Sequence, residues 1–245
     1  MQERDFDDSS LWRISEFERL RRQMGSSGYA RLDGPTVLST TLLAELQRRD
    51  TDAARGDVLE VLAACVRQHE SALLYLKHDG HVWPVTVFPA SDLYHSPRPL
   101  QPSRDLGLAD VTLLAVEPPG LRPPGHYQHE RVGRADAYRP LVPLLWQLAL
   151  HGPRERLLAE VGGTAAYRAL GVAARLGATG AIGAALERLR RETVPLREIA
   201  TWPGMSVERA ARLVNALYLA RSLMVMRAHP AARAEPASRL SSSRG

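Results

Sequence analysis

The stretch from Gly177 to Arg227 constrains the fold more than any other part of the chain, because helix-forming and β-prone runs follow one another in a set order. A run with helical periodicity (TGAIGAALERLRRE) precedes a short helical run (VPLREIATWPGM), a longer one (SVERAARLVNALYLARS) and a β-prone run (LMVMRA). These patterns predict a helix, a short helix, a turn, a longer helix and a strand.

The longest of these helices has a start signal and two distinct faces. Ser206 stands at the N-cap position, directly after the helix-breaking Trp202-Pro203-Gly204. Spacings of three and four residues predict a face that packs on the body of the domain, made of Val207, Ala210, Ala211, Val214, Leu217 and Tyr218. The opposite face carries Glu208, Arg209, Arg212, Asn215 and Ala216.

This order of elements resembles a winged helix-turn-helix domain, over about residues 177–228. The resemblance implies a helix that enters the major groove of DNA, with Arg209, Arg212 and Asn215 at base edges. It also implies phosphate contacts from Arg188, Arg190, Arg191, Arg221 and Arg227. Many winged helices bind proteins instead of DNA. The same residues therefore also predict a surface that binds an acidic protein partner.

Charge is distributed unevenly along the chain. Residues 1–138 hold 16 positive and 20 negative side chains, whereas residues 139–245 hold 16 positive and 7 negative ones. The positive C-terminal half would attract phosphate backbones, acidic protein faces or anionic lipid. The acidic start (MQERDFDDSS) lacks the pattern of a signal peptide, and no run is long and apolar enough for a membrane span. With Cys65 as the only cysteine, we expect a bacterial cytoplasmic protein without a disulfide or a membrane partner.

The N-terminal part predicts a small domain of helices followed by an antiparallel sheet. Helical periodicity runs from Leu11 to Met24, from Pro35 to Arg49 and from Gly56 to His69, with Asp57 as an N-cap. Two β-prone runs, SALLYLK and HVWPVTVF, flank the hairpin signal Asp79-Gly80, and a third strand is expected at Asp110–Glu117. Pro84 predicts that its strand is an edge strand or contains a bulge.

These elements predict an α+β protein with two domains: a helix-plus-sheet domain over residues 11–120 and a mainly helical, winged-helix-like domain over residues 138–228. The Pro- and Gly-rich residues 121–137 are expected to be the linker, and residues 1–10 and 229–245 a flexible N-terminus and a disordered tail. Within the second domain, helices are expected from Tyr138 to His151, beginning at or just after Pro143, and from Arg154 to Val161 and Thr164 to Leu176.

No motif in the sequence predicts catalysis or a cofactor. A phosphate-binding lysine motif is excluded because the only lysine is Lys77, and the glycines at 177, 180 and 183 follow no clear strand. Cys65 and His69 could form a zinc site with His78 and His81, but a buried cysteine and exposed histidines are the simpler expectation. His126 and His129 are expected to be exposed linker residues.

The sequence therefore predicts a non-enzymatic regulatory or adaptor protein without a metal site. The first domain would sense or dock, and the second would bind a protein partner. A DNA-binding transcriptional regulator using helix 206–220 and the surrounding arginines is the alternative. A structural or adaptor protein whose second domain packs against its own first domain, or against a second copy of the chain to give a homodimer, is a further possibility.

Overall fold

The computed structural model describes residues 12–15, 17, 19, 38, 41–42, 57–78, 80–97, 108–171 and 177–232. It combines helices with antiparallel sheets, as the α+β prediction requires. The chain divides into two compact units, Met1–Arg154 and Glu155–Gly245. The boundary thus lies C-terminal to the linker expected at residues 121–137.

The first unit is built on a six-stranded sheet in the order β5-β2-β3-β4-β6, with β1 paired to β3. These strands are β1 (Trp12–Arg13), β2 (Ala72–His78), β3 (His81–Phe88), β4 (Leu93–His95), β5 (Thr112–Glu117) and β6 (Tyr138–Pro140). The hairpin and the third strand expected from the sequence are confirmed as β2, β3 and β5. Gly80 in the hairpin turn has φ 72°, a left-handed conformation that glycine adopts without steric cost.

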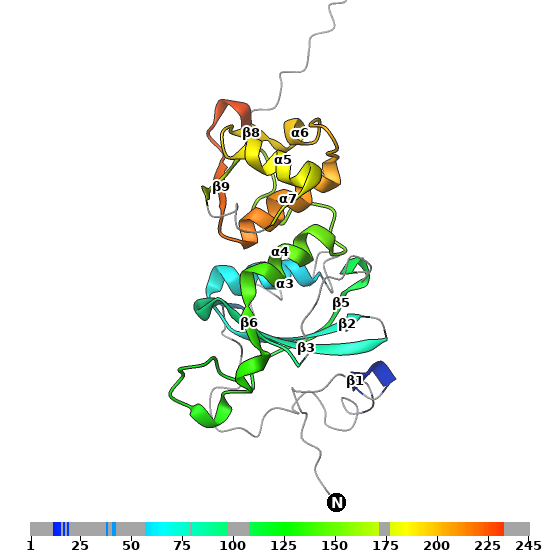
Figure 1. Cartoon of the computed structure of the whole chain (residues 1–245), viewed down its shortest axis with the longest axis vertical. Coiled ribbons are helices and arrows are strands. Elements are labelled where there is room, and N and C mark those ends of the chain that lie inside the picture. Colours follow the sequence, from blue (N-terminus) through cyan, green and yellow to red (C-terminus); the bar gives the residue numbers. More distant parts are fainter. Residues whose placement is uncertain are drawn as a thin grey trace, which may run out of the picture. The chain divides into compact units, whose positions relative to one another are not determined.

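Two helices, α3 (Val58–Gln68) and α4 (Leu141–His151), lie side by side on one face of this sheet (Figure 1). The predicted N-cap of α3 is confirmed, because Asp57 Oδ1 accepts hydrogen bonds from Leu59 N at 3.0 Å and Glu60 N at 3.3 Å. Buried Arg154, just after α4, donates to Asp57 Oδ2 and lies 2.6 Å from Glu60 Oε1. A buried ion cluster therefore joins the region after α4 to the start of α3.

The placement of α4 corrects the predicted domain layout. Residues 138–151 were expected to open the second domain, but β6 pairs with β4 and α4 packs against α3 in the first unit. The helix begins at Leu141, before Pro143, which the first turn tolerates because its N–H groups have no partner within the helix.

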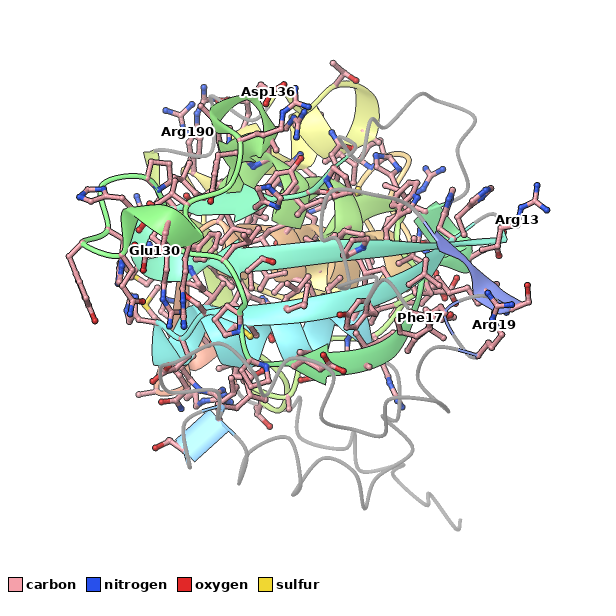
Figure 2. All side chains as sticks on the ribbon, turned by 90° about the horizontal axis from the view of Figure 1, so that it is seen from below. Arg13, Phe17, Arg19, Glu130, Asp136 and Arg190 are labelled. Carbon is pink, nitrogen blue, oxygen red and sulfur yellow. The ribbon has the colours of Figure 1, made fainter. Side chains whose placement is uncertain are left out.

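Phe17, shortly after β1, packs on the other face of the sheet. It is 2% exposed, and its ring is tilted against that of Tyr75 of β2 with centroids 4.8 Å apart, whereas Arg13 points away from the sheet (Figure 2). The helix predicted from Leu11 to Met24 is corrected at its start, since Trp12 and Arg13 form β1 and helical residues begin at Ile14. Of the predicted helix Pro35–Arg49, only Leu38, Thr41 and Leu42 lie within the described residues.

Pro84 lies in an interior strand, which corrects the prediction of an edge strand or bulge. It pairs with Tyr75 of β2 on one side of β3. On the other side, the described residues of β1 pair with His81 and Val82, and β4 pairs with Thr86, Val87 and Phe88. Pro84 falls in the interval between these described pairs, so its missing N–H removes none of their hydrogen bonds.

The segment 118–137 is a braced loop of the first unit and not a linker. The Tyr138 hydroxyl donates to Arg122 O at 2.6 Å and accepts from Gly133 N at 2.8 Å, and Arg122 N donates to Arg131 O at 2.9 Å. A side chain at Gly133 would come within 2.8 Å of His95 Nε2. Proline and glycine thus prevent a long helix or strand here, while turns and side chains still fix the backbone.

Within its described residues, the second unit combines three helices with a three-stranded sheet in the order β8-β7-β9. Its elements are β7 (Ala166–Ala169), α5 (Gly180–Leu189), β8 (Val194–Pro195), α6 (Leu196–Ile199), α7 (Val207–Leu219) and β9 (Leu223–Met226). The helix, short helix, longer helix and strand expected after Gly177 are all present. The central strand comes from β7, which precedes α5 in the chain and pairs with both β8 and β9.

Two helices expected before Gly177 are absent. Residues 154–161 contain turns, and Ala166–Ala169 form β7; residues 172–176 lie outside the described part. Pairing of β7 on both sides outweighs the helical propensity of this alanine-rich run. Part of the expected tail is ordered, since Pro230–Ala232 form a short 3-10 helix with Ala232 buried. No helix in the described part of the chain is long and apolar enough to cross a membrane.

Candidate functional site

The turn before α7 holds the first of the predicted contact residues, Arg209. Gly204 has φ 72°, and a Cβ at this position would lie 2.8 Å from the Cβ of Ala181 in α5. The Ser206 hydroxyl caps the helix by accepting from Arg209 N at 3.2 Å, as predicted. The guanidinium of Arg209 then reaches back and donates to Gly204 O at 2.5 Å. Arg209 is exposed, and it braces the turn that begins its own helix.

Asn215 is not available to a partner, which corrects its predicted place on the outer face of the helix. Its side chain is fully buried, at 0% exposure. The amide oxygen accepts from Leu158 N at 2.9 Å, and the amide nitrogen donates to Arg156 O at 2.9 Å. The side chain expected to read a base therefore holds the backbone of residues 156–158 in place.

The same segment covers the neighbouring position on α7. Arg212 is partly buried, and its guanidinium lies 3.4 Å from a carboxylate oxygen of Glu155. Ala216, also expected to face outward, is fully buried. On the side expected to pack, Ala210, Ala211, Val214 and Leu217 are buried as predicted, whereas Val207 is 58% exposed. Only the first turn of α7 presents an exposed surface.

The arginines near the end of α5 already contact groups of their own unit. Arg188 lies over the Trp202 ring, 4.6 Å from its centroid, and its Nε is 2.9 Å from Glu192 Oε2. Arg190 pairs with Glu187 at 2.9 Å. Arg191 is exposed and forms no ion pair or side-chain hydrogen bond within the described residues. Exposed ion pairs contribute only about 0–1 kcal/mol, so these arginines could be redirected to a partner at small cost.

Arg221 and Arg227 flank β9. Arg221 is exposed and follows α7 in a left-handed conformation with φ 53°. Arg227 donates to Gly162 O at 2.8 Å and to Glu160 O at 2.9 Å. The two terminal nitrogens of the Arg227 guanidinium thus donate to carbonyl groups in the turn before β7, so this residue serves mainly to join β9 to that turn.

The first unit contains no arrangement of the predicted histidine and cysteine ligands that would hold a metal. Cys65 is buried in α3 as expected, and burial raises the pKa of its thiol to about 12. His81 is exposed, but His78 is buried, which corrects the expectation of an exposed histidine at that position. His69 occupies the left-handed C-cap of the helix. Within the described residues, no three histidine, cysteine or acidic side chains gather closely enough to bind a metal ion.

Sequence reasoning missed two exposed features that the structure brings out. Tyr127 is 79% exposed at the braced loop, where its ring stacks on His126 with centroids 4.4 Å apart; Figure 2 shows Glu130 on the same loop. In the second unit, Leu170 and Met224 are large apolar residues at 38% and 42% exposure. The composition of residues 117–126 suggested only an irregular segment, and Leu170 was expected to lie in a helix.

Comparisons of this chain with protein-family models, with curated proteins and with solved structures found no match. The assignment of a function therefore depends on the physical properties of the surfaces described above.

Proposed function

We propose that this protein is a non-enzymatic regulatory adaptor whose second unit, a winged-helix-like module, binds an acidic protein partner. The observation that carries the proposal is the burial of Asn215. A helix that reads bases needs exposed polar side chains that can reach base edges in the major groove. Here the amide of Asn215 is already bonded to residues 156 and 158, and Arg212 faces Glu155.

The exposed groups of the second unit suit a protein partner better than a groove of DNA. Three of the four large apolar side chains exposed in the described residues belong to this unit: Leu170, Val207 and Met224. Interfaces between proteins combine apolar contacts with arginine, whereas DNA contacts are dominated by cations facing phosphates. Residues 155–245 contain 14 arginines and 7 acidic residues, so the unit is basic and an acidic partner is favoured.

Site-specific photo-crosslinking in the source organism tests this proposal. A photoreactive amino acid would replace Val207 or Met224, and exposed Ala184 of α5 would serve as the control position. We expect one discrete protein adduct from at least one of the two test positions and none from the control. Adducts that nuclease removes, at either test position, would refute the proposal.

A fluorescence-anisotropy titration of a mixed-sequence DNA duplex with the full chain at three salt concentrations tests the alternative. If α7 and five phosphate-contacting arginines bind DNA, log K should fall against log salt with a slope of about −4 to −5. We expect no saturable binding at 150 mM salt. Tight binding with that slope, lost when Arg209 and Arg212 are both replaced by glutamate, would establish the DNA-binding alternative instead.

A further inference from the structure

Strand β9 is an apolar edge strand. Among the described residues it pairs with β7 alone, and its other side is not covered by any described strand. Its four residues, Leu223–Met226 (LMVM), include no charge and no proline. Natural edge strands are usually protected by such residues, because an unprotected edge can pair with another chain.

The hydrogen-bond register shows which backbone groups of β9 face outward. Leu170 N donates to Ser222 O at 2.8 Å, so residues 170 and 222 form a hydrogen-bonded pair. Hydrogen-bonded and non-bonded pairs alternate along an antiparallel ladder. Leu223 and Val225 are therefore in non-bonded pairs with Ala169 and Tyr167, and their N–H and C=O groups point away from β7. Within the described residues, these outward groups have no hydrogen-bond partner.

One face of the sheet beside this edge is apolar and basic. Arg168 lies directly opposite Met224 across the β7–β9 ladder, and both side chains are exposed. Side chains two residues apart on a strand share a face, so exposed Leu170 lies on this face as well. A strand added beside β9 would place its side chains next to Met224, with the positive charge of Arg168 close by.

We propose that β9 is a docking edge, to which an acidic, extended segment of the partner protein adds as a fourth strand. This inference rests on the proposed function and specifies how that partner binds. The backbone groups of Leu223 and Val225 would supply the hydrogen bonds of the new ladder. Apolar residues of the added strand would lie opposite Leu223 and Val225 and bond to them. The acidic residues between them would then lie on the face of Met224 and Leu170, where Arg168 favours them, and exposed Arg221 favours a further acidic residue beside the strand.

A second copy of this chain fits the edge less well. Antiparallel pairing that joins Leu223 of each copy to Val225 of the other uses all the outward-facing groups. In that register Arg221, two residues before Leu223, lies opposite Arg227 of the other copy, two residues after Val225. Like charges directly opposite each other destabilise a strand pair, so the charge pattern favours an acidic strand over a copy of β9.

The test uses the full chain and a fluorescein-labelled heptapeptide that alternates glutamate and valine, Glu-Val-Glu-Val-Glu-Val-Glu. Three matched peptides serve as controls: one with lysine in place of glutamate, one with N-methylated valines, and one with proline at the central valine. We expect the parent peptide to bind at least tenfold more tightly than each control. Equal affinity for the N-methylated peptide would show that no strand pairing occurs and would overturn the inference.

Two protein variants locate the peptide on the surface. Arg168→Glu should weaken binding of the parent peptide by about fivefold, because reversing one exposed charge alters roughly 1 kcal/mol. The matched control, Arg197→Glu, changes another exposed arginine of the same unit and should alter affinity by less than twofold. Equal losses in the two variants would mean that net charge alone drives binding, which also overturns the inference.

Substitution at the edge gives a third check that separates this inference from the proposed function. Val225→Pro removes an outward N–H, which an edge strand tolerates, and should abolish peptide binding while circular dichroism stays unchanged. Self-association by sedimentation that Val225→Pro abolishes would identify a second copy as the occupant and overturn the acidic-strand inference. If no peptide binds but Met224 still crosslinks to a protein, the docking geometry fails and the proposed function stands.

Discussion

Replacing Asn215 by alanine tests whether this residue is structural or faces a partner. The substitution removes both the acceptor for Leu158 N and the donor to Arg156 O. Leu158 is fully buried, so its N–H would lose its partner where water does not reach it. A buried donor left unsatisfied costs about 1–3 kcal/mol. The carbonyl of exposed Arg156 can turn to water and adds little.

We therefore expect Asn215→Ala to destabilise the segment around Leu158 by about 2 kcal/mol, which corresponds to a roughly 30-fold change in an opening equilibrium. Hydrogen exchange is the suitable assay, because two units need not unfold together and exchange reports each segment separately. Exchange at the Leu158 amide should accelerate about 30-fold, while amides of the β2–β3 hairpin should keep their wild-type rates.

The control is Arg191→Ala, which alters an exposed side chain and should change the exchange of Leu158 by less than twofold. The reasoning would be refuted if Asn215→Ala left the exchange of Leu158 within twofold of the wild type. It would be refuted more strongly if the same variant kept its exchange rates and lost affinity for a DNA duplex. That pair of results would mean that Asn215 meets a base and that its buried hydrogen bonds are not kept in solution.

Three further predictions concern the first unit. Arg154→Ala should destabilise it by about 3–5 kcal/mol in urea denaturation, because Asp57 and Glu60 would lose their buried cation; an effect below 1 kcal/mol would contradict this. Cys65, whose pKa burial raises to about 12, should react with a thiol reagent at pH 8 only after unfolding. Burial, and then nearby Arg139, lower the pKa of His95 below 6.5. Since the unfolded state then binds a proton that the native state rejects, urea midpoints should fall as pH drops below about 6.5, and less so in His95→Gln.

Sequence reasoning succeeded where neighbouring residues determine the structure. The Asp57 cap of α3 and the Ser206 cap of α7 need only the first turn that follows them, and both are present. The Asp79-Gly80 signal likewise predicted the hairpin of β2 and β3 because the turn requires a positive φ, which Gly80 adopts. These local signals were sufficient to locate α3, α7 and the β2–β3 hairpin.

It failed where distant segments determine the structure. Residues 166–169 form a strand because Val194 and residues 223–226 pair with them on either side, and no local pattern contains that information. Similarly, Tyr138 fixes Arg122 and Gly133 through its hydroxyl group, which turned an expected linker into a braced loop. Composition indicated correctly that no long helix or strand forms there, but it could not show that hydrogen bonds fix the backbone of the loop.

The candidate site shows that predictions made from charge have the same limit. The arginine content predicted an anion-binding surface, but the net charge of a unit does not say which cations are free to bind. Arg209 and Arg227 donate to backbone carbonyls, and Arg188 lies over an indole ring. The periodicity of α7 assigned Asn215 to the outside because it could not detect residues 155–158, which lie about 57 positions away in the chain and cover that face.

The features that remain open to a partner therefore come from the sheet more than from the helix that resembles a recognition helix. The edge of β9 offers unpaired backbone groups, and Met224 and Leu170 offer apolar contacts beside Arg168. Backbone pairing supplies affinity with little dependence on sequence, while the side chains beside it supply specificity. A unit whose arginines mainly stabilise its own turns can thus still select an acidic partner, because a few exposed cations beside an open strand are enough to bias which segment pairs with it.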